Sequence, residues 1–174
     1  MDTQVRKLDY DNIDPEIMKE AGDIIRAGGL VAFPTETVYG LGGDALNPES
    51  SKKIYAAKGR PSDNPLIVHI EERADLYKIA AKVPEKAEKM MDAFWPGPLT
   101  LIFPKTDRVP SETTGGLDTV AVRMPSDGIA AAFIRAAGGF IAAPSANVSG
   151  RPSTTTAAHV IEDLSGSFSD SGTV

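Results

Sequence analysis

Short apolar runs alternate with helical patterns along most of the chain, and this alternation limits the fold more than any other feature of the sequence. The runs are rich in Val, Ile, Leu and Phe, which is typical of buried strands. They read LVAF, LIVHI, LTLIF, TVAV and FIAAP. Such interleaving predicts an α/β domain in which helices pack on a twisted, mixed sheet. Prolines next to several runs indicate edge strands or strands that end abruptly.

The helical segments carry start and stop signals. Asp14-Pro15 and Asn47-Pro48 each combine a capping side chain with a proline in the first turn, and Gly28 ends the first helix. The segment PTETVYGLGGDALNPES reads as a loop because of its Pro and Gly content, and residues 105–116 have no clear period. The expected helices are about 14–28, 47–57, 72–81, 84–95, 127–138 and 155–165.

Composition excludes several classes of protein. With 174 residues, 41% of them hydrophobic and 24% charged, the chain fits one domain, and we expect residues 1–174 to form it. No apolar run approaches the roughly 20 residues of a membrane span, and the N-terminus lacks a signal peptide's apolar segment, so we expect a cytoplasmic protein without membrane contact. Cysteine is absent and there are only two histidines, His69 and His159, which disfavours a metal bound by the protein itself. The net charge of −6 disfavours a generally basic, nucleic-acid-binding surface.

Two cations, Lys58 and Arg60, lie in the turn KGRPSDNP between a predicted helix and a predicted strand. Interaction with the helix dipole accounts for Lys58. It does not account for Arg60, which follows a glycine and precedes Pro61 in a stiff turn. A guanidinium held in this way suits a phosphate group, so we expect the partner of Arg60 to be a ligand and not a protein group. No Gly-rich phosphate-binding loop is present, so side chains would have to hold a nucleotide.

Three polar segments follow directly after predicted strands, namely PTETVYG, RMPSD and PSANVSGRPS. Each segment alone is explained by turn formation. Because ligands of α/β sheets bind beyond the carboxyl ends of the strands, the three together predict one shared crevice.

Individual residues of these segments leave alternatives open. Glu36 is either a base, a cation ligand or a solvated loop residue, and Arg123 is either an anion clamp or half of a partly buried ion pair. His69 lies on a strand, on the face opposite Val68, where a lone histidine is usually structural. Ser145 lacks the G-x-S-x-G context, so a serine hydrolase is disfavoured.

Five blocks in order, FPTETVYGLG, KGRPSDNPLIVHI, WPGPLT, TVAVRMP and APSANVSGRPS, resemble the YrdC/TsaC family of threonylcarbamoyl-AMP synthases. Together they span most of the chain, from Phe33 to Ser153. The resemblance implies an open, strongly twisted mixed sheet with flanking helices and a large, positively lined concave cavity. It also implies the reaction in which L-threonine, bicarbonate and ATP, with Mg²⁺ carried by the nucleotide, give L-threonylcarbamoyl-AMP and pyrophosphate for tRNA modification.

The resemblance also implies roles for individual residues. Thr37, His69 and Arg123 would bind L-threonine, with Arg123 on its carboxylate. Lys58 and Arg60 would neutralise charge during catalysis, without a protein nucleophile. The residues that would bind ATP are Lys58, Arg60, Asn64, Thr119, Ser145, Asn147 and Ser153.

The chain departs from the family pattern at its C-terminal end. The family pattern continues into a Gly-Gly segment and a Glu-Ser-Thr strand, whereas this chain continues as SGSFSDSGTV. We therefore expect a domain truncated at its C-terminus, with a frayed tail at 165–174 and an unpaired sheet edge that favours association. Two other functions stay open: an RNA-binding module of the same fold, contacting tRNA or double-stranded RNA, and a related enzyme that adenylates another carbamate. The expected partner downstream is a tRNA threonylcarbamoyl transferase.

Overall fold

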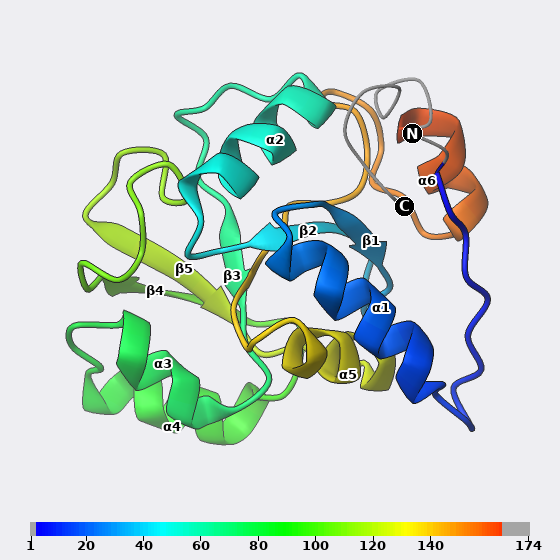
Figure 1. Cartoon of the computed structure of the whole chain (residues 1–174). Coiled ribbons are helices and arrows are strands. Elements are labelled where there is room, and N and C mark those ends of the chain that lie inside the picture. Colours follow the sequence, from blue (N-terminus) through cyan, green and yellow to red (C-terminus); the bar gives the residue numbers. More distant parts are fainter. Residues whose placement is uncertain (1–2, 165–174) are drawn as a thin grey trace.

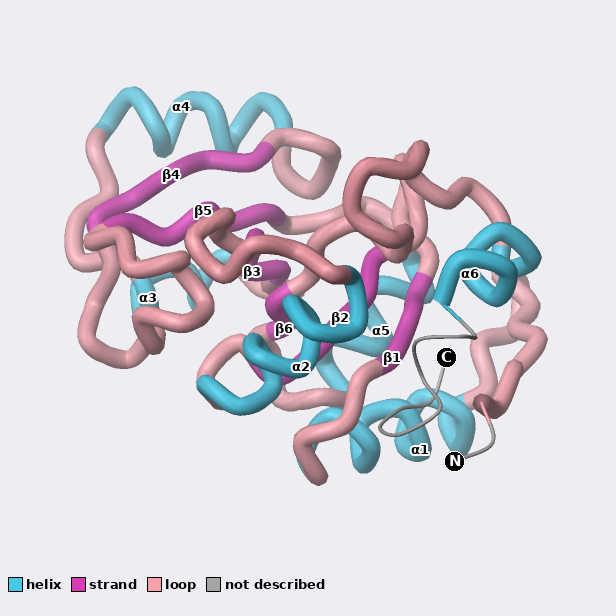
Figure 2. The backbone as a smooth tube through the Cα atoms, turned by 90° about the horizontal axis from the view of Figure 1, so that it is seen from above, coloured by secondary structure: helices cyan, strands magenta, loops and turns pink. Residues whose placement is uncertain are grey.

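A six-stranded sheet forms the centre of the computed structural model, which describes residues 3–164 (Figure 1). Its order is β1-β2-β6-β3-β5-β4; β3 and β5 run parallel and the other neighbours antiparallel. Figure 2 shows β1 and β4 at the two ends of the sheet, and the prediction of a mixed sheet is confirmed. The strands are β1 (Val31–Phe33), β2 (Gly40–Asp44), β3 (Ile67–His69), β4 (Thr100–Pro104), β5 (Thr119–Arg123) and β6 (Ile141–Ala142).

The helices begin close to the predicted positions. The side chains of Asp14 and Asn47 accept hydrogen bonds from the backbone N–H groups of Glu16, at 2.9 Å, and Glu49, at 3.0 Å, so both predicted caps are confirmed. The helices are α1 (Pro15–Arg26), α2 (Pro48–Lys58), α3 (Arg73–Ile79), α4 (Glu85–Phe94), α5 (Gly128–Ala136) and α6 (Ala157–Leu164).

The sheet separates two apolar clusters, because successive residues of a strand point to opposite faces. Ile141 of β6 belongs to a cluster with residues of α1 and α5, which pack side by side (Figure 1). The next residue, Ala142, belongs to the larger cluster, to which α2, α3 and α6 contribute. In the same way, Val68 of β3 lies in the larger cluster, and the adjacent His69 meets the ring of Phe33 from the smaller one.

The interpretation of the whole segment PTETVYGLGGDALNPES as a loop is wrong, because its centre forms β2. Glycine is disfavoured in strands by propensity, which explains the error. Tertiary packing requires glycine here: a Cβ on Gly42 would lie 2.9 Å from Cγ2 of Ile141 and 3.0 Å from the ring of Phe33. A Cβ on Gly43 would lie 3.0 Å from Leu30. Neighbouring side chains fill the space that a β2 side chain would need.

Within residues 3–164 no helix has the length and apolar character needed to cross a membrane. The predicted frayed tail, 165–174, lies outside the described residues.

Candidate active site

Two of the three polar segments, which follow β1 and β6, are joined by backbone hydrogen bonds. The N–H of Leu41 donates to Pro144 O at 2.9 Å, and that of Ala146 donates to Tyr39 O at 2.8 Å. Tyr39 in turn donates to Thr154 O at 2.8 Å. The third segment meets the first of these through Arg123, at the end of β5, which donates hydrogen bonds to Glu36 and Thr37. The three segments are therefore connected through the loop after β1, whereas the crevice that they are expected to share stays a prediction.

Arg123 is 9% exposed and its guanidinium faces the loop after β1. Its Nη2 donates to Glu36 Oε1 at 2.7 Å and to Thr37 Oγ1 at 3.2 Å, and its Nε donates to Gly97 O at 3.4 Å. The partly buried ion pair, one of the two readings of Arg123, is thus present. Thr35 orders the same loop, since its hydroxyl donates to Val38 O at 2.6 Å.

His69 is the direct strand neighbour of Arg123 in the parallel pairing of β3 with β5. It is 4% exposed, its Nδ1 lies 3.2 Å from Ile67 O, and its ring meets Phe33 edge-on at 6.0 Å. Burial, together with the nearby charge of Arg123, lowers the pKa of His69 to about 4. The imidazole is therefore neutral at physiological pH, so it can contact a ligand as a hydrogen-bonding group and not as a cation. The three residues assigned to threonine lie together.

The depressed pKa of His69 predicts a loss of stability in mild acid. The unfolded chain binds a proton at His69 near pH 6.5 and the folded chain only near pH 4, so stability falls as pH drops below the unfolded value. We expect the free energy of unfolding to decrease by about 2 kcal/mol between pH 7 and pH 5, above the range in which most carboxylates titrate. Urea denaturation at a series of pH values measures it.

His69→Gln should remove most of this pH dependence. His159→Gln, which changes an exposed histidine, should retain it. If wild type and His69→Gln lose stability in parallel, His69 takes up its proton in the folded state and the assigned burial effect is wrong.

Lys58, the last residue of α2, is 2% exposed. Its Nζ donates to the carbonyl oxygens of Ser145 and Asn147, which lie 87 and 89 residues further along the chain. The Ser149 N–H donates back to Lys58 O at 2.9 Å. Interaction with its own helix dipole is therefore not the main role of this side chain, contrary to the sequence-based interpretation. Burial and the charge of Arg60 lower the pKa of Lys58 to about 8.

Arg60 also has protein partners, so the expectation that only a ligand would bind it is wrong. Its Nη2 donates to Asn64 Oδ1 at 2.6 Å and to Pro65 O at 3.1 Å. The stiff turn supplies these acceptors because it folds back on the arginine within five residues. All acceptors of Lys58 and Arg60 are neutral, and neither cation forms an ion pair within the described part of the chain. The two positive charges therefore remain without an anionic contact, and that of Lys58 lies next to the Ser145–Asn147 segment.

The other residues assigned to ATP lie in different surroundings, some of them buried and some exposed. Asn147 is buried and donates to Val148 O and Arg151 O, both at 2.9 Å, while its Oδ1 has no hydrogen-bond partner among residues 3–164. Ser153 is exposed. Thr119 begins β5, where it pairs with Pro104, four residues before Arg123 and so about 13 Å from it along the strand. The roles assigned to Thr119 and Ser153, like those of the other residues assigned to ATP, stay predictions.

Sequence reasoning did not identify Glu36 as the partner of Arg123. The motif PTETVYG contains it, but 87 residues separate the two side chains and a single sequence carries no signal for such a pairing.

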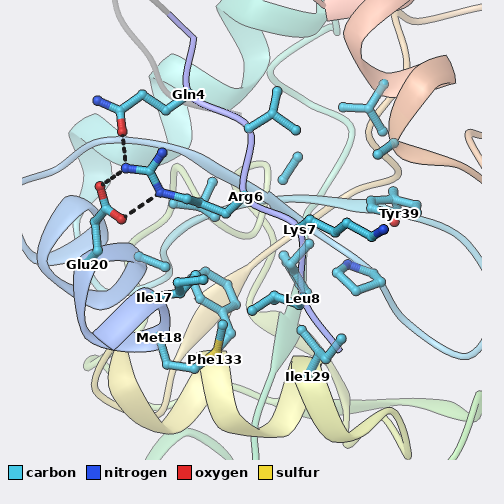
Figure 3. Close-up of a pocket in the computed structure, with 18 of the residues that line it drawn as sticks. Gln4, Arg6, Lys7, Leu8, Ile17, Met18, Glu20, Tyr39, Ile129 and Phe133 are labelled. Carbon is cyan, nitrogen blue, oxygen red and sulfur yellow. Dashed lines mark hydrogen bonds and ion pairs between the residues drawn. The ribbon is translucent and has the colours of Figure 1, made fainter. Parts of the chain in front are cut away.

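An apolar cavity of about 460 Å³ lies elsewhere, between the N-terminal segment, α1, β1, α5 and α6 (Figure 3). Leu8, Ile17, Met18 and Phe133 contribute to its lining, and none of the ten residues assigned to threonine or ATP does so. It is therefore not the positively lined cavity that the resemblance implies, which stays a prediction.

The family model Sua5_yciO_yrdC, whose description is telomere recombination, matches residues 23–169. The chain belongs to this family. It is 58% identical over 146 residues to a threonylcarbamoyl-AMP synthase of Pyrococcus abyssi and 56% identical over 154 residues to one of Bacillus subtilis. These alignments cover 84% and 88% of the chain, but only 43% and 44% of the relatives, so the chain spans less than half of their length.

Solved structures of the Sua5/YciO/YrdC family share the fold. The crystal structure of P. abyssi Sua5 complexed with L-threonine superposes with a TM-score of 0.88 at 54% identity. The match covers 90% of this chain and 46% of that protein. The open mixed α/β architecture that the resemblance implies is confirmed.

Proposed function

We propose that this chain is the synthase domain of a threonylcarbamoyl-AMP synthase, a nucleotidyltransferase. It would convert L-threonine, bicarbonate and ATP, with the Mg²⁺ ion that accompanies the nucleotide, into L-threonylcarbamoyl-AMP and pyrophosphate. The two relatives above carry this name, at 58% and 56% identity. The observation that carries the proposal is the contact of Lys58 with the Ser145 and Asn147 carbonyls, because it joins the Lys-x-Arg and Ser-x-Asn motifs at one place.

The chemistry requires positioning and charge neutralisation more than a protein nucleophile. The threonine ammonium and bicarbonate give a carbamate, with loss of water and a proton. A carbamate oxygen then attacks the α-phosphorus of ATP, and the bond to the departing pyrophosphate breaks. Lys58 and Arg60 would stabilise the charge on the phosphate oxygens, since neither cation has an anionic partner among the described residues, 3–164. Asn64, Thr119, Ser145, Asn147 and Ser153 would complete the ATP site.

The amino-acid site would be formed by Thr37, His69 and Arg123. Arg123 offers a planar set of donors suited to a carboxylate. Neutral His69 and the Thr37 hydroxyl would add hydrogen bonds without a competing charge. The product would pass to a tRNA threonylcarbamoyl transferase. We also propose that the reaction takes place in the cytoplasm and that the domain contacts tRNA.

The test is pyrophosphate release from ATP in the presence of bicarbonate and labelled L-threonine. The proposal predicts release that requires both threonine and bicarbonate, with label appearing in an adenylate. Release that occurs with another amine and not with threonine would instead indicate a related carbamoyl-adenylating enzyme. Binding of tRNA or double-stranded RNA without any release would indicate an RNA-binding module.

A further inference from the structure

The carboxylate of Glu36 occupies only part of the Arg123 guanidinium. The Glu36 side chain is 21% exposed and that of Arg123 is 11% exposed, so the pair is partly buried. Nη2 of Arg123 donates hydrogen bonds to both Glu36 and Thr37, and its Nε donates to Gly97 O. Nη1 has no hydrogen-bond partner within residues 3–164. A second carboxylate can therefore bind Arg123 through Nη1 while Glu36 stays in place.

A ligand carboxylate bound in this way would lie beside a second negative charge. Two neighbouring carboxylates in a partly buried site repel each other unless a cation lies between them. Burial tends to raise the pKa of Glu36, but the hydrogen bond and charge of Arg123 and nearby backbone N–H groups hold it below the ordinary value. Glu36 is thus ionised at neutral pH, and one guanidinium would face two anions.

An α-amino acid brings the missing cation with it. Its ammonium and carboxylate groups are attached to the same carbon, so a carboxylate on Nη1 of Arg123 places the ammonium within a few ångströms of the neighbouring groups. Glu36 is the carboxylate in direct contact with Arg123, and the alternation of charge would then run Arg123, ligand carboxylate, ligand ammonium, Glu36. A carboxylic acid without an amine would leave the repulsion uncompensated.

We propose that Glu36 binds the α-ammonium group of the amino-acid substrate, and that the Glu36–Arg123 pair selects a zwitterion against carboxylic acids that lack the amine. This inference rests on the proposed function, in which Arg123 binds the substrate carboxylate. It concerns binding and specificity and not proton transfer, because a carboxylate with a depressed pKa is a weak base.

The simpler alternative is that Glu36 only holds Arg123 in position. In that case its removal would disturb every ligand that uses Arg123 by a similar factor. The two readings differ in how the loss depends on the amine of the ligand, and this difference can be measured.

The experiment compares two ligands, L-threonine and (R)-3-hydroxybutyrate, which has the same carboxylate and hydroxyl groups but no amine. Calorimetric affinities are measured for wild type, Glu36→Gln and Glu36→Asp, with Glu16→Gln on the exposed face of α1 as the matched control. A charged hydrogen bond of this kind is worth about 10- to 100-fold in affinity. We expect Glu36→Gln to weaken L-threonine binding by that factor and to leave 3-hydroxybutyrate binding unchanged or stronger.

Glu36→Asp keeps the charge and should retain part of the preference for threonine. If the glutamine variant fails to fold, this variant still tests the proposal. Glu16→Gln should behave as wild type. Equal weakening of both ligands in Glu36→Gln, or no change in either, would overturn the role of Glu36 while leaving the synthase proposal intact. Failure of wild type to bind L-threonine at all would overturn the proposed function, and this inference with it.

Discussion

Replacing Lys58 by alanine is expected to lower the free energy of unfolding by about 3 kcal/mol. The substitution leaves the carbonyls of Ser145 and Asn147 without their donor in a place where the lysine is almost completely buried. Buried carbonyls without a partner are costly, and the loss of a long buried side chain adds a cavity. Urea denaturation at pH 7 measures the effect.

Two further variants separate the causes. Lys58→Met keeps most of the volume and removes the charged donor, so the difference between the methionine and alanine variants reports packing alone. Lys52→Ala removes an exposed lysine from the same helix, which pairs with Glu49, and should change stability by less than about 0.5 kcal/mol. If Lys58→Ala were as harmless as Lys52→Ala, Lys58 would not hold the Ser145–Asn147 segment in solution.

Arg123→Ala is expected to raise the threonine requirement of the proposed synthase reaction by about 100-fold or more and to leave the ATP requirement nearly unchanged. The reason is that Arg123 contacts the Glu36–Thr37 loop, whereas the cations assigned to ATP lie at the end of α2 and in the turn that follows. Initial rates with threonine and ATP varied in turn provide the measurement. Equal increases in both requirements would contradict the assignment.

Arg123→Ala also leaves the Glu36 carboxylate partly buried and unpaired, which by itself costs stability. The double variant Arg123→Ala, Glu36→Gln removes this stray charge and serves as the folded reference. If the double variant recovers stability but not threonine use, the loss of activity reflects the missing Glu36–Arg123 pair and not a damaged fold.

Local signals in the sequence were sufficient for most helices and strands, because caps and apolar runs act over a few residues. Asp14 and Asn47 show this, since each begins its helix by a hydrogen bond within two positions. The strand β2 could not be found in this way. Its glycines are required by Phe33, Ile141 and Leu30, which come from other parts of the chain.

The candidate site shows the same limit. Sequence reasoning selected Lys58, Arg60 and Arg123 but did not predict the protein contacts of Lys58 and Arg60, and it left the choice open for Arg123. The partners of Lys58 lie 87 and 89 residues away, and Glu36 and Thr37 lie 87 and 86 residues from Arg123. The partners of Arg60 depend on how one turn folds back. Residue type predicted which groups carry charge, whereas only the fold shows which of these groups already bind other protein atoms.

The glycines of β2 leave room for the ring of Phe33, which in turn contacts a residue of the candidate site. A methyl group on Gly40 would lie 3.2 Å from the ring of Phe33, and one on Gly42 would lie 3.0 Å from it. The same ring also meets the imidazole of His69 edge-on. A side chain added to this strand would therefore press on a ring that also contacts the histidine beside Arg123, so positions that carry no chemistry themselves are restricted to glycine by their link to the site.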